Sequence, residues 1–402
     1  MTQFRDRRLP LIYAIILLDV IVGSAIGPIM PAFVKGLDKP QVWLSVGTAL
    51  FLGVQLFSAP LLGKLADGYG RRPIFIISAI GTLVADILLL PVRVGFYFAN
   101  RLSDGVSNGM YAAVRSAITD ISPKEQLFKN LGVEGVIVSL GFVLGPLVSG
   151  ILLTVFDVPA AQQAGVVVAM TLVISGANIL LTFLLGETHP NPPGVSRVEL
   201  RAELRNSLNI STIWARLQAK DVTVPGLLKL VMMQVCLTLG LGYYHYFVAF
   251  ISLGELQMTA RDISYFFIFF GALSIVVNYG FYGFVADRIN QRRWIFWLAL
   301  AGIPILAGYG LSGSSLTVLY AVIIVDCLTI SLIQGLIEGL MAQLTTDDDR
   351  GEVFGLNQAM QGLASFSTTI VFGALSVVDL RLPFLWFAAC MGAVAWLAKS
   401  SR

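Results

Sequence analysis

The stretch Gly63–Pro73 reads GKLADGYGRRP and joins two long apolar runs. A second stretch, Gly283–Arg293, reads GFVADRINQRR and also follows an apolar run. Glycine, alanine, aspartate and a final arginine coincide between the two stretches at an offset of 220 residues. A repeat of this kind predicts a duplicated unit in which each copy carries the loop after its second helix.

The composition predicts a membrane protein. Of the 402 residues, 56% are hydrophobic and 13% are charged, whereas a soluble domain carries about 25% charged residues. The charges stand in bursts between apolar runs and form no basic stripe, so no nucleic-acid partner is expected. The three cysteines, Cys236, Cys327 and Cys390, lie singly inside apolar runs, so neither a metal site nor a disulfide framework is expected.

Apolar runs long enough to span a bilayer recur along the whole chain, since a membrane helix needs about 20 apolar residues. They lie at 10–33, 42–63, 73–93, 95–119, 132–155, 163–186, 224–250, 262–284, 293–312, 316–343, 353–375 and 380–398. We therefore predict an all-α membrane protein with twelve transmembrane helices in two pseudo-symmetric six-helix bundles. The bundles are expected at 1–186 and 224–402, with a linker at 187–223.

Lysine and arginine predict the orientation. Nineteen of them lie in the terminal segments and in every second connection, against five in the opposite connections. Because basic loops stay in the cytoplasm, both termini are expected on the cytoplasmic side of the cell inner membrane. The N-terminal run from Leu11 to Phe33 is too long for a signal peptide and is taken as the first membrane helix.

The linker combines a proline-rich start with a basic stretch. Leu200, Leu204 and Leu208 recur at helical spacing among charged residues. This pattern predicts a short helix, which is either solvated or lies as a basic amphipathic helix on the inner leaflet.

Several motifs resemble a known family. Gly63–Arg72 resembles the loop signature of the major facilitator superfamily, G-x-L-x-D-x-x-G-R-R. Arg101–Gly105 is similar to its fourth-helix signature, and Gly141–Gly150, GFVLGPLVSG, is similar to the fifth-helix signature of its drug/proton antiporters. Leu18–Asp19 and Gly27–Pro31 resemble tetracycline-type exporters. The resemblance covers nearly the whole chain and is strongest from 15 to 150.

The resemblance implies a twelve-helix drug/proton antiporter, of the kind associated with multidrug efflux and antibiotic resistance, that works as a monomer without a cofactor. Two departures concern the substrate. The helix at 293–312 has no acidic residue where tetracycline exporters carry one, and Asp86 lies one position from their third-helix acid. The resemblance therefore implies the antiporter class and not tetracycline itself.

The loop signature is the candidate gate. Its glycines permit a tight turn and close helix approach, and Asp67 can either cap the following helix or pair with Arg71. The resemblance adds Asp120, at the end of the fourth helix, as a further partner. It implies a cytoplasmic gate formed by Gly63, Asp67, Gly70, Arg71, Arg72 and Asp120. The alternative is a turn that only fixes topology.

The fifth helix carries small residues at close to four-residue spacing. Gly141, Gly145 and Gly150 are expected to form a groove for a neighbouring helix, and Pro146 removes a backbone donor and bends the helix. The bend either seals the cavity against proton leak or belongs to ordinary small-residue packing.

Ionisable residues at membrane depth are functional hypotheses, because burying their charge is costly. We therefore place proton coupling and the substrate cavity at Asp19, Asp86, Arg101, Asp104, Asp326 and Glu338. Asp19 is expected to carry the proton, with Arg101 and its helical neighbour Asp104 controlling its charge. Asp86 is the rival for this role, and mutually paired structural charges are the alternative.

The predicted function is export of a small, partly hydrophobic compound in exchange for protons. The aromatic runs 243–246 and 266–270 could line a pocket for flat apolar cations, or be interface and lipid-facing residues. Uptake of a nutrient by proton symport is the second possibility, although midplane amides are few. A membrane-embedded enzyme is the third, but no HExxH, GxSxG or Walker motif is present.

Overall fold

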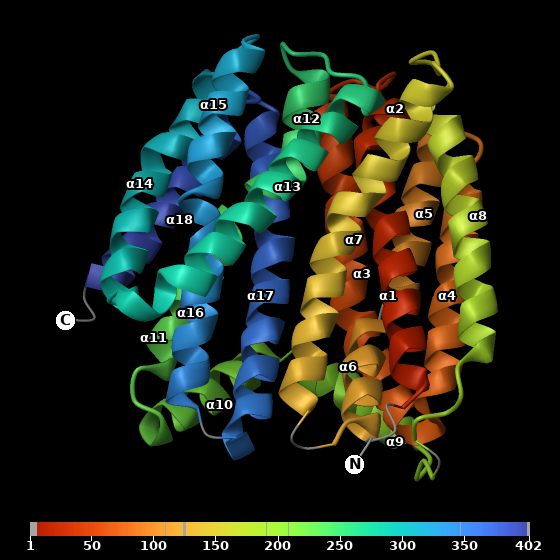
Figure 1. Ribbon diagram of the computed structural model, residues 1–402, viewed down its shortest axis with the longest axis vertical. Helices are drawn as coiled ribbons and strands as arrows, with labels where there is room; N and C mark the ends of the chain where they lie inside the picture. Colours follow the sequence, from red (N-terminus) through yellow and green to blue (C-terminus); the bar gives the residue numbers. More distant parts are fainter. Residues whose placement is uncertain are drawn as a thin grey trace. The chain divides into compact units, whose positions relative to one another are not determined.

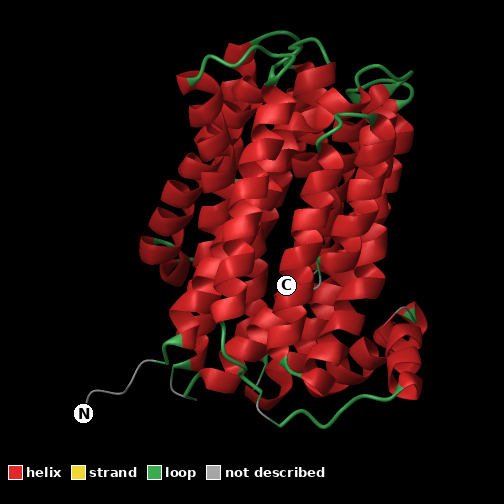
Figure 2. Cartoon of the chain, turned by 90° about the vertical axis from the view of Figure 1, so that its right-hand side faces the viewer, coloured by secondary structure: helices red, strands yellow, loops and turns green. Residues whose placement is uncertain are grey.

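The structure is a computed structural model that describes residues 6–108, 110–123, 126–189, 191–207, 209–345 and 347–399. Every regular element within these residues is a helix, and Figure 2 shows helices joined by loops. Ten helical stretches are long and apolar enough to cross a membrane. The prediction of an all-α, multi-pass membrane fold is therefore confirmed.

Two predicted membrane segments are absent from those ten stretches, one because its helix is broken and the other because it carries polar residues. The segment 95–119 is divided between α5 (Val94–Ser107) and α6 (Met110–Ile121). The segment 353–375 lies in α17 (Asp347–Ser376), which carries the polar side chains of Asn357 and Gln361. Both segments are helical, as predicted, but they are less apolar or less continuous than the other spans.

The chain forms two compact units, of which the first comprises Met1–Gly36, Leu50–Leu208 and Thr259–Ile268. Its helices are α1 (Arg8–Ile26), η1 (Gly27–Ile29), α2 (Met30–Val34), most of α3 (Pro40–Tyr69), α4 (Arg71–Leu89), α5, α6, α7 (Leu127–Val155), α8 (Gln163–Leu184) and α9 (Arg197–Ser207). Within this unit, α1 packs against α7 and α8, and α4 packs against α5 and α8. Figure 1 shows these helices running side by side.

Helix α1 is the centre of the first unit. Its side chains are apolar around most of the circumference, which is typical of a helix buried on all sides. Ile12 and Ile16 are fully buried with Phe75 of α4 and Val114 of α6. The hydroxyl of Tyr13 donates a hydrogen bond to the carbonyl of Asn130 at 2.9 Å, which ties α1 to α7.

The second unit comprises Leu37–Ala49, Asn209–Met258 and Phe269–Arg402. Its helices are α10 (Ile210–Thr223), α11 (Leu227–Gly240), α12 (Tyr243–Leu253), most of α13 (Ala260–Phe284), η2 (Ala286–Arg288), α14 (Gln291–Leu311), α15 (Leu316–Cys327), α16 (Ile330–Leu344), α17 and α18 (Leu382–Lys399). Helix α18 packs against α14 and α11. The predicted domain boundaries stay a prediction.

The linker contains two helices, where the sequence indicated one. Helix α9 covers the predicted leucine pattern except Leu208, which lies outside the described residues. Helix α10 was not expected, because it is too short and polar for a membrane span. Its buried residues Ile213 and Leu217 lie on one face, and the helix packs against α11 and α17.

Candidate functional site

The carboxylate of Asp19 lies on α1 and is half-buried. Its two oxygens accept hydrogen bonds from Thr82 of α4 at 3.4 Å and from Tyr111 of α6 at 3.5 Å. Hydroxyl hydrogen bonds are commonly about 2.7–2.8 Å long, so both bonds are weak. The group is therefore held loosely and keeps capacity for a proton or a cation.

Arg101 is held by several partners around it on α3 and α5. Its guanidinium lies 3.7 Å from the carboxylate of Asp104 and donates from Nε to Asn100 Oδ1 at 2.7 Å. It also lies over the ring of Phe51, 5.5 Å from the centroid, at a distance where cation–π attraction acts. The predicted proximity of Arg101 and Asp104 is thus present in the structure.

Asp19 and Arg101 are connected through Asp104. No ion pair or hydrogen bond joins Asp19 to Arg101 directly among the described residues, whereas the charge of Asp104 does act on Asp19. The charges of Asp104, Asp19 and Arg101 act on Asp86 as well. These residues therefore interact electrostatically, and Arg101 forms an ion pair with Asp104. Whether this group carries the coupling proton stays a prediction.

Asp86 lies in a different environment from Asp19. Its side chain is 1% exposed, and its carboxylate accepts a short hydrogen bond of 2.7 Å from Ser175 of α8. The group is therefore sealed where α4 packs against α8, whereas Asp19 and Asp104 remain partly accessible.

The second unit buries its own carboxylate at the break between α15 and α16. Asp326 is completely buried and accepts hydrogen bonds from the hydroxyls of Tyr243 and Tyr309, the shortest at 2.7 Å. Such donors offset part of the cost of burying a carboxylate. Glu338 lies twelve residues further on, about 18 Å along the helical path, and accepts from Gln334. The structure does not bring these two acids together.

The predicted aromatic pocket is partly a core. Tyr243 and Tyr246 are fully buried, and Tyr246 donates to the carbonyl of Leu380 at 2.9 Å. The ring of Tyr243 packs edge-on against Phe247, with the centroids 5.2 Å apart. These side chains therefore stabilise the second unit and hold Asp326.

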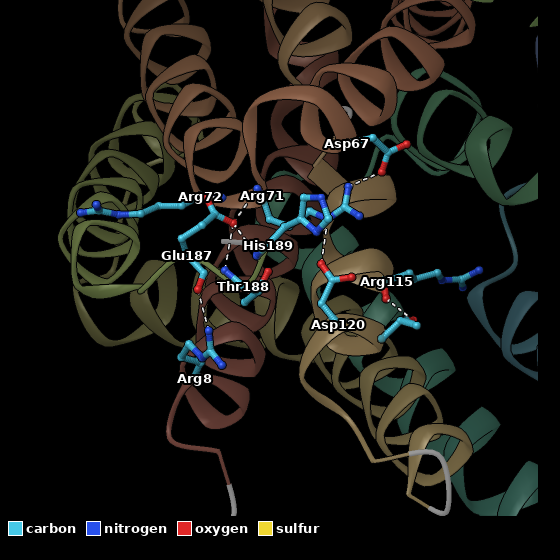
Figure 3. Close-up of polar contacts among 10 residues, drawn as sticks. Arg8, Asp67, Arg71, Arg72, Arg115, Asp120, Glu187, Thr188 and His189 are labelled. Carbon is cyan, nitrogen blue, oxygen red and sulfur yellow. Dashed lines mark hydrogen bonds and ion pairs between the residues drawn. The ribbon is translucent and has the colours of Figure 1, made fainter. Parts of the chain in front are cut away.

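The loop signature forms an ionic cluster in the first unit, drawn in Figure 3. The Arg71 guanidinium contacts Asp67 of α3 and, at 3.0 Å, Asp120 of α6. Of the two roles open to Asp67, the structure shows the pair with Arg71. Because the Arg71 side chain is only 8% exposed, its charge depends on these two partners.

The start of α4 is capped by Glu187, the first residue of the predicted linker, which no sequence motif singles out as functional. The backbone N–H groups of Arg71 and Arg72 donate to its carboxylate at 2.8 and 3.1 Å. Those of Thr188 and His189 donate at 2.9 Å each. Burial raises the pKa of Glu187, but these four backbone hydrogen bonds lower it, and the net pKa is below its usual range.

The glycines of α7 lie against neighbouring helices. A Cβ atom on Gly141 would come within 2.6 Å of Val20 Cβ, and one on Gly145 within 2.0 Å of Ser24 Oγ. A Cβ on Gly150 would lie 3.3 Å from Ser264 on α13. The first two glycines therefore form the groove that receives α1. Pro146 follows Gly145 inside α7.

The second copy of the loop is capped differently. Asn290 precedes α14 and its own side chain accepts from the N–H of Arg293 at 3.1 Å. The side chain of Asp287, the counterpart of Asp67, lies outside the described part of the structure. Among the described residues, no group of three histidine, cysteine or acidic side chains could hold a metal ion.

Comparisons with known proteins agree with this architecture. The quinolone resistance protein NorA of Staphylococcus aureus (strain MSSA476) is 24% identical over 378 residues, covering 93% of this chain and 90% of that protein. The class H tetracycline resistance protein of Pasteurella multocida is 30% identical over 149 residues, covering 35% of this chain and 37% of that protein.

Solved structures share the fold at low sequence identity. The human organic anion transporter MFSD10 superposes with a TM-score of 0.69 at 17% identity, covering 98% of this chain and 100% of that one. A POT family peptide transporter superposes with a TM-score of 0.71 at 12% identity, covering 98% and 97%.

The profile of the Major Facilitator Superfamily matches residues 12–369, which is most of the chain. Its members are transporters of small molecules and not enzymes. The resemblance noted from the motifs is thus confirmed at the level of the family and of the transporter class. The chain belongs to the Major Facilitator Superfamily.

Proposed function

We propose that this transporter exports a small, partly hydrophobic compound in exchange for protons by alternating access. Both termini would lie in the cytoplasm, and the membrane would be the inner membrane of the cell. The likeness to quinolone and tetracycline resistance proteins supports a drug-like substrate. The basic residues of alternate connections support the orientation.

The observation that carries the proposal is the loosely bonded carboxylate of Asp19. A proton carrier must be reachable from water and must change its charge without breaking a strong structural contact. Asp19 is half-buried and its two hydrogen bonds are 3.4 and 3.5 Å long. Asp86 is sealed by comparison, so Asp19 fits the role better.

Asp104 would supply the coupling between proton and substrate. Two carboxylates that interact favour the uptake of a proton or of a cation by one of them, because like charges repel. A cationic substrate that approaches Asp19 would therefore displace its proton, which gives exchange at a single site. Arg101 would keep Asp104 charged through their 3.7 Å contact.

The ionic cluster of Asp67, Arg71 and Asp120 would act as the cytoplasmic gate. It joins the ends of α3, α4 and α6 within the first unit. Such a cluster can hold one conformation and be released in another, because its Asp67 side chain is 56% exposed, and an ion pair in contact with water is worth only about 0–1 kcal/mol.

The energy coupling can be tested with purified protein in liposomes. A pH gradient with the acidic solution on the periplasmic side of the protein should drive ethidium or a fluoroquinolone from the cytoplasmic side to the periplasmic side. Adding substrate should move protons in the opposite direction. A proton ionophore should stop both fluxes. Substrate and protons moving in the same direction would indicate symport, and a requirement for ATP would remove the proposal.

The proton site can be tested by comparing Asp19→Asn with Asp86→Asn in detergent. Adding ethidium or a fluoroquinolone to the wild type should release protons, and only Asp19→Asn should abolish that release. Normal release from Asp19→Asn would make Asp19 a structural charge and transfer the role to Asp86.

A further inference from the structure

The start of α4 lacks a local cap. Gly70 precedes the helix with a φ of +101°, a conformation that side chains rarely adopt, and has no side chain to accept from the helix N–H groups. Serine, threonine, aspartate and asparagine are preferred at this position because their side chains can accept from the first helix N–H groups. The N–H groups of Arg71 and Arg72 therefore need an acceptor from elsewhere.

Glu187 supplies that acceptor from 116 residues away in sequence. Each of its two carboxylate oxygens accepts one N–H group of α4, at 2.8 Å from Arg71 and 3.1 Å from Arg72. Negative charge is also favourable at a helix N-terminus, because the helix dipole is positive there. Charge-assisted hydrogen bonds of this kind are among the stronger polar contacts.

The carboxylate of Glu187 can approach the start of α4 because Gly70 has no side chain. A Cβ atom at this position would lie 2.5 Å from Glu187 Oε2 and 2.9 Å from its Cδ. The carboxylate therefore occupies the space that a side chain would fill. A glycine is therefore favoured at position 70 for two reasons: the turn requires a positive φ, and the Glu187 carboxylate approaches too closely for a side chain.

The beginning of the linker is attached to the loop at further points. The N–H of Gly194 donates to the carbonyl of Gly68 at 2.9 Å. A Cβ atom on Gly68 would lie 2.6 Å from Val195 Cβ, so Val195 packs directly onto this glycine. Arg8 donates to the carbonyl of Glu187 at 2.5 Å, which holds the residue from the side of α1. Glu187 is therefore fixed on both sides.

Arg71 takes part in both contacts: its backbone N–H donates to Glu187, and its side chain carries the positive charge of the proposed gate. Arg71 has its backbone on Glu187 and its guanidinium on Asp67 and Asp120 (Figure 3). Fixing the first residue of a helix fixes the direction of its Cα–Cβ bond. The backbone contact thus determines whether the guanidinium reaches both carboxylates.

We propose that Glu187 is the positioning residue of the Asp67–Arg71–Asp120 gate. Its carboxylate sets the first turn of α4, aims Arg71 at its two partners, and attaches the linker to the loop signature. The assignment rests on the proposed function only in treating this ionic cluster as a gate. The local part of the proposal, that Glu187 holds Arg71 in place, depends only on the hydrogen bonds between these residues and not on the proposed function.

The second copy of the loop provides a matched control. Helix α14 begins at the equivalent position but is capped by its own Asn290, which accepts from Arg293. Asn290→Ala therefore removes a side-chain cap at the equivalent helix start without touching Arg71. Any effect shared by this variant and a Glu187 variant reflects loss of a cap in general.

The local part can be tested without a substrate. Arg71 would be labelled with phenylglyoxal in the purified full-length protein and followed by peptide mass spectrometry. Glu187→Gln keeps the size of the side chain but places amide donors against N–H groups, and should speed labelling of Arg71 about threefold or more, because the first turn opens more often. Gly70→Ala should do the same by expelling Glu187, whereas Asn290→Ala should leave Arg71 unchanged.

Labelling of Arg71 in Glu187→Gln at the wild-type rate would overturn the proposal. An equal increase in Asn290→Ala would overturn it as well, because the effect would then not be specific to Glu187. Should Glu187→Gln fail to fold, Glu187→Asp offers a shorter carboxylate and the same measurement, with labelling expected between the wild type and Gly70→Ala.

Transport separates a positioning role from a structural one. In liposomes, Glu187→Gln should lower the turnover of ethidium about tenfold, equivalent to about 1.4 kcal/mol, with KM changed less than about twofold. Adding Glu187→Gln to Asp67→Asn should lower turnover little further, because both act through Arg71. Additive losses would overturn the link to the gate. No slowing by Asp67→Asn alone would instead refute the gate in the proposed function, while the labelling result would still decide the role of Glu187.

Discussion

Replacing Gly145 by alanine should disrupt the packing of α1 on α7. The added Cβ would lie 2.0 Å from Ser24 Oγ, 2.6 Å from the carbonyl oxygen of Ile21 and 2.8 Å from the N atom of Ala25. Two of these three atoms are backbone atoms of α1, so rotating a side chain cannot relieve the overlap. The helices must move apart instead.

The loss of stability in Gly145→Ala can be calculated from the distance by which the helices must move apart. Carbon and oxygen atoms normally approach to about 3.4 Å, so the helices must shift by roughly 0.8 Å near this point. A gap of 0.5–1 Å forfeits about a quarter to a half of each dispersion contact along the seam. Overpacking in well-packed cores costs about 1–3 kcal/mol, and we expect about 3 kcal/mol here because backbone must move.

The same helix offers a matched control at Gly132. A Cβ atom there meets nothing within 4 Å, so Gly132→Ala should stabilise α7 by about 0.5–1 kcal/mol through helix propensity. Both variants make the same chemical change on one helix. The midpoint of unfolding in an SDS titration would be measured for each, together with ethidium transport.

The expected result is a lowered midpoint for Gly145→Ala and an unchanged or raised midpoint for Gly132→Ala. Equal midpoints for the two variants would show that the α1–α7 contact is not as close as the structure has it. A normal midpoint with lost transport in Gly145→Ala would favour the sealing role over packing.

Three further changes give distinct expectations. Asp67→Asn should leave ethidium binding in detergent unchanged and slow turnover in liposomes, because it removes one partner of Arg71 outside the Asp19 site; loss of binding at normal stability would contradict the gate assignment. Tyr309→Phe should destabilise the second unit by about 1–3 kcal/mol, because Asp326 is fully buried and would lose a 2.7 Å hydrogen bond. Tyr279→Phe, on an exposed ring of the same unit, is the control. Equal midpoints of thermal unfolding for the two variants would count against a structural role for the Asp326 contacts. Glu187 has a lowered pKa in the folded protein, so its contribution to stability should be present above about pH 4.5 and be lost as the pH falls through the folded pKa. The difference in unfolding midpoint between the wild type and Glu187→Gln should therefore shrink below about pH 4.5. A difference that stays constant with pH would refute the charged contact.

The positions of the membrane helices could be predicted because they depend on local composition. The prediction of 163–186 matches α8 at Gln163–Leu184, and that of 262–284 matches α13 at Ala260–Phe284. An apolar run of sufficient length has no alternative to a helix in lipid, since its backbone groups must bond internally. Helix α10 was missed because that rule does not apply to a short polar segment.

Residue spacing alone predicts contacts within the site only where the partners are close in sequence, and the pairing of Arg71 with Asp120 across 49 residues was implied by the family resemblance. Arg101 and Asp104 are three residues apart on one helix, and Asp67 and Arg71 are four apart, so spacing alone places them together. Tyr111 reaches Asp19 across 92 residues, and Ser175 reaches Asp86 across 89. No local pattern encodes such pairs, because they depend on how the helices pack.

The two copies of the loop show how a repeat can hide a difference that matters for mechanism. Their sequences align at glycine, alanine and aspartate, yet Asn290 caps α14 from within the loop while α4 depends on Glu187. A local cap stays in place whatever the rest of the chain does. A cap delivered by Glu187, three residues beyond α8, is present only while α8 and α4 keep their contact. The direction of the Arg71 side chain therefore depends on the packing of a helix that is remote in sequence. The first loop is therefore suited to respond to helix movement, whereas the cap of α14 that the structure describes comes from within its own loop.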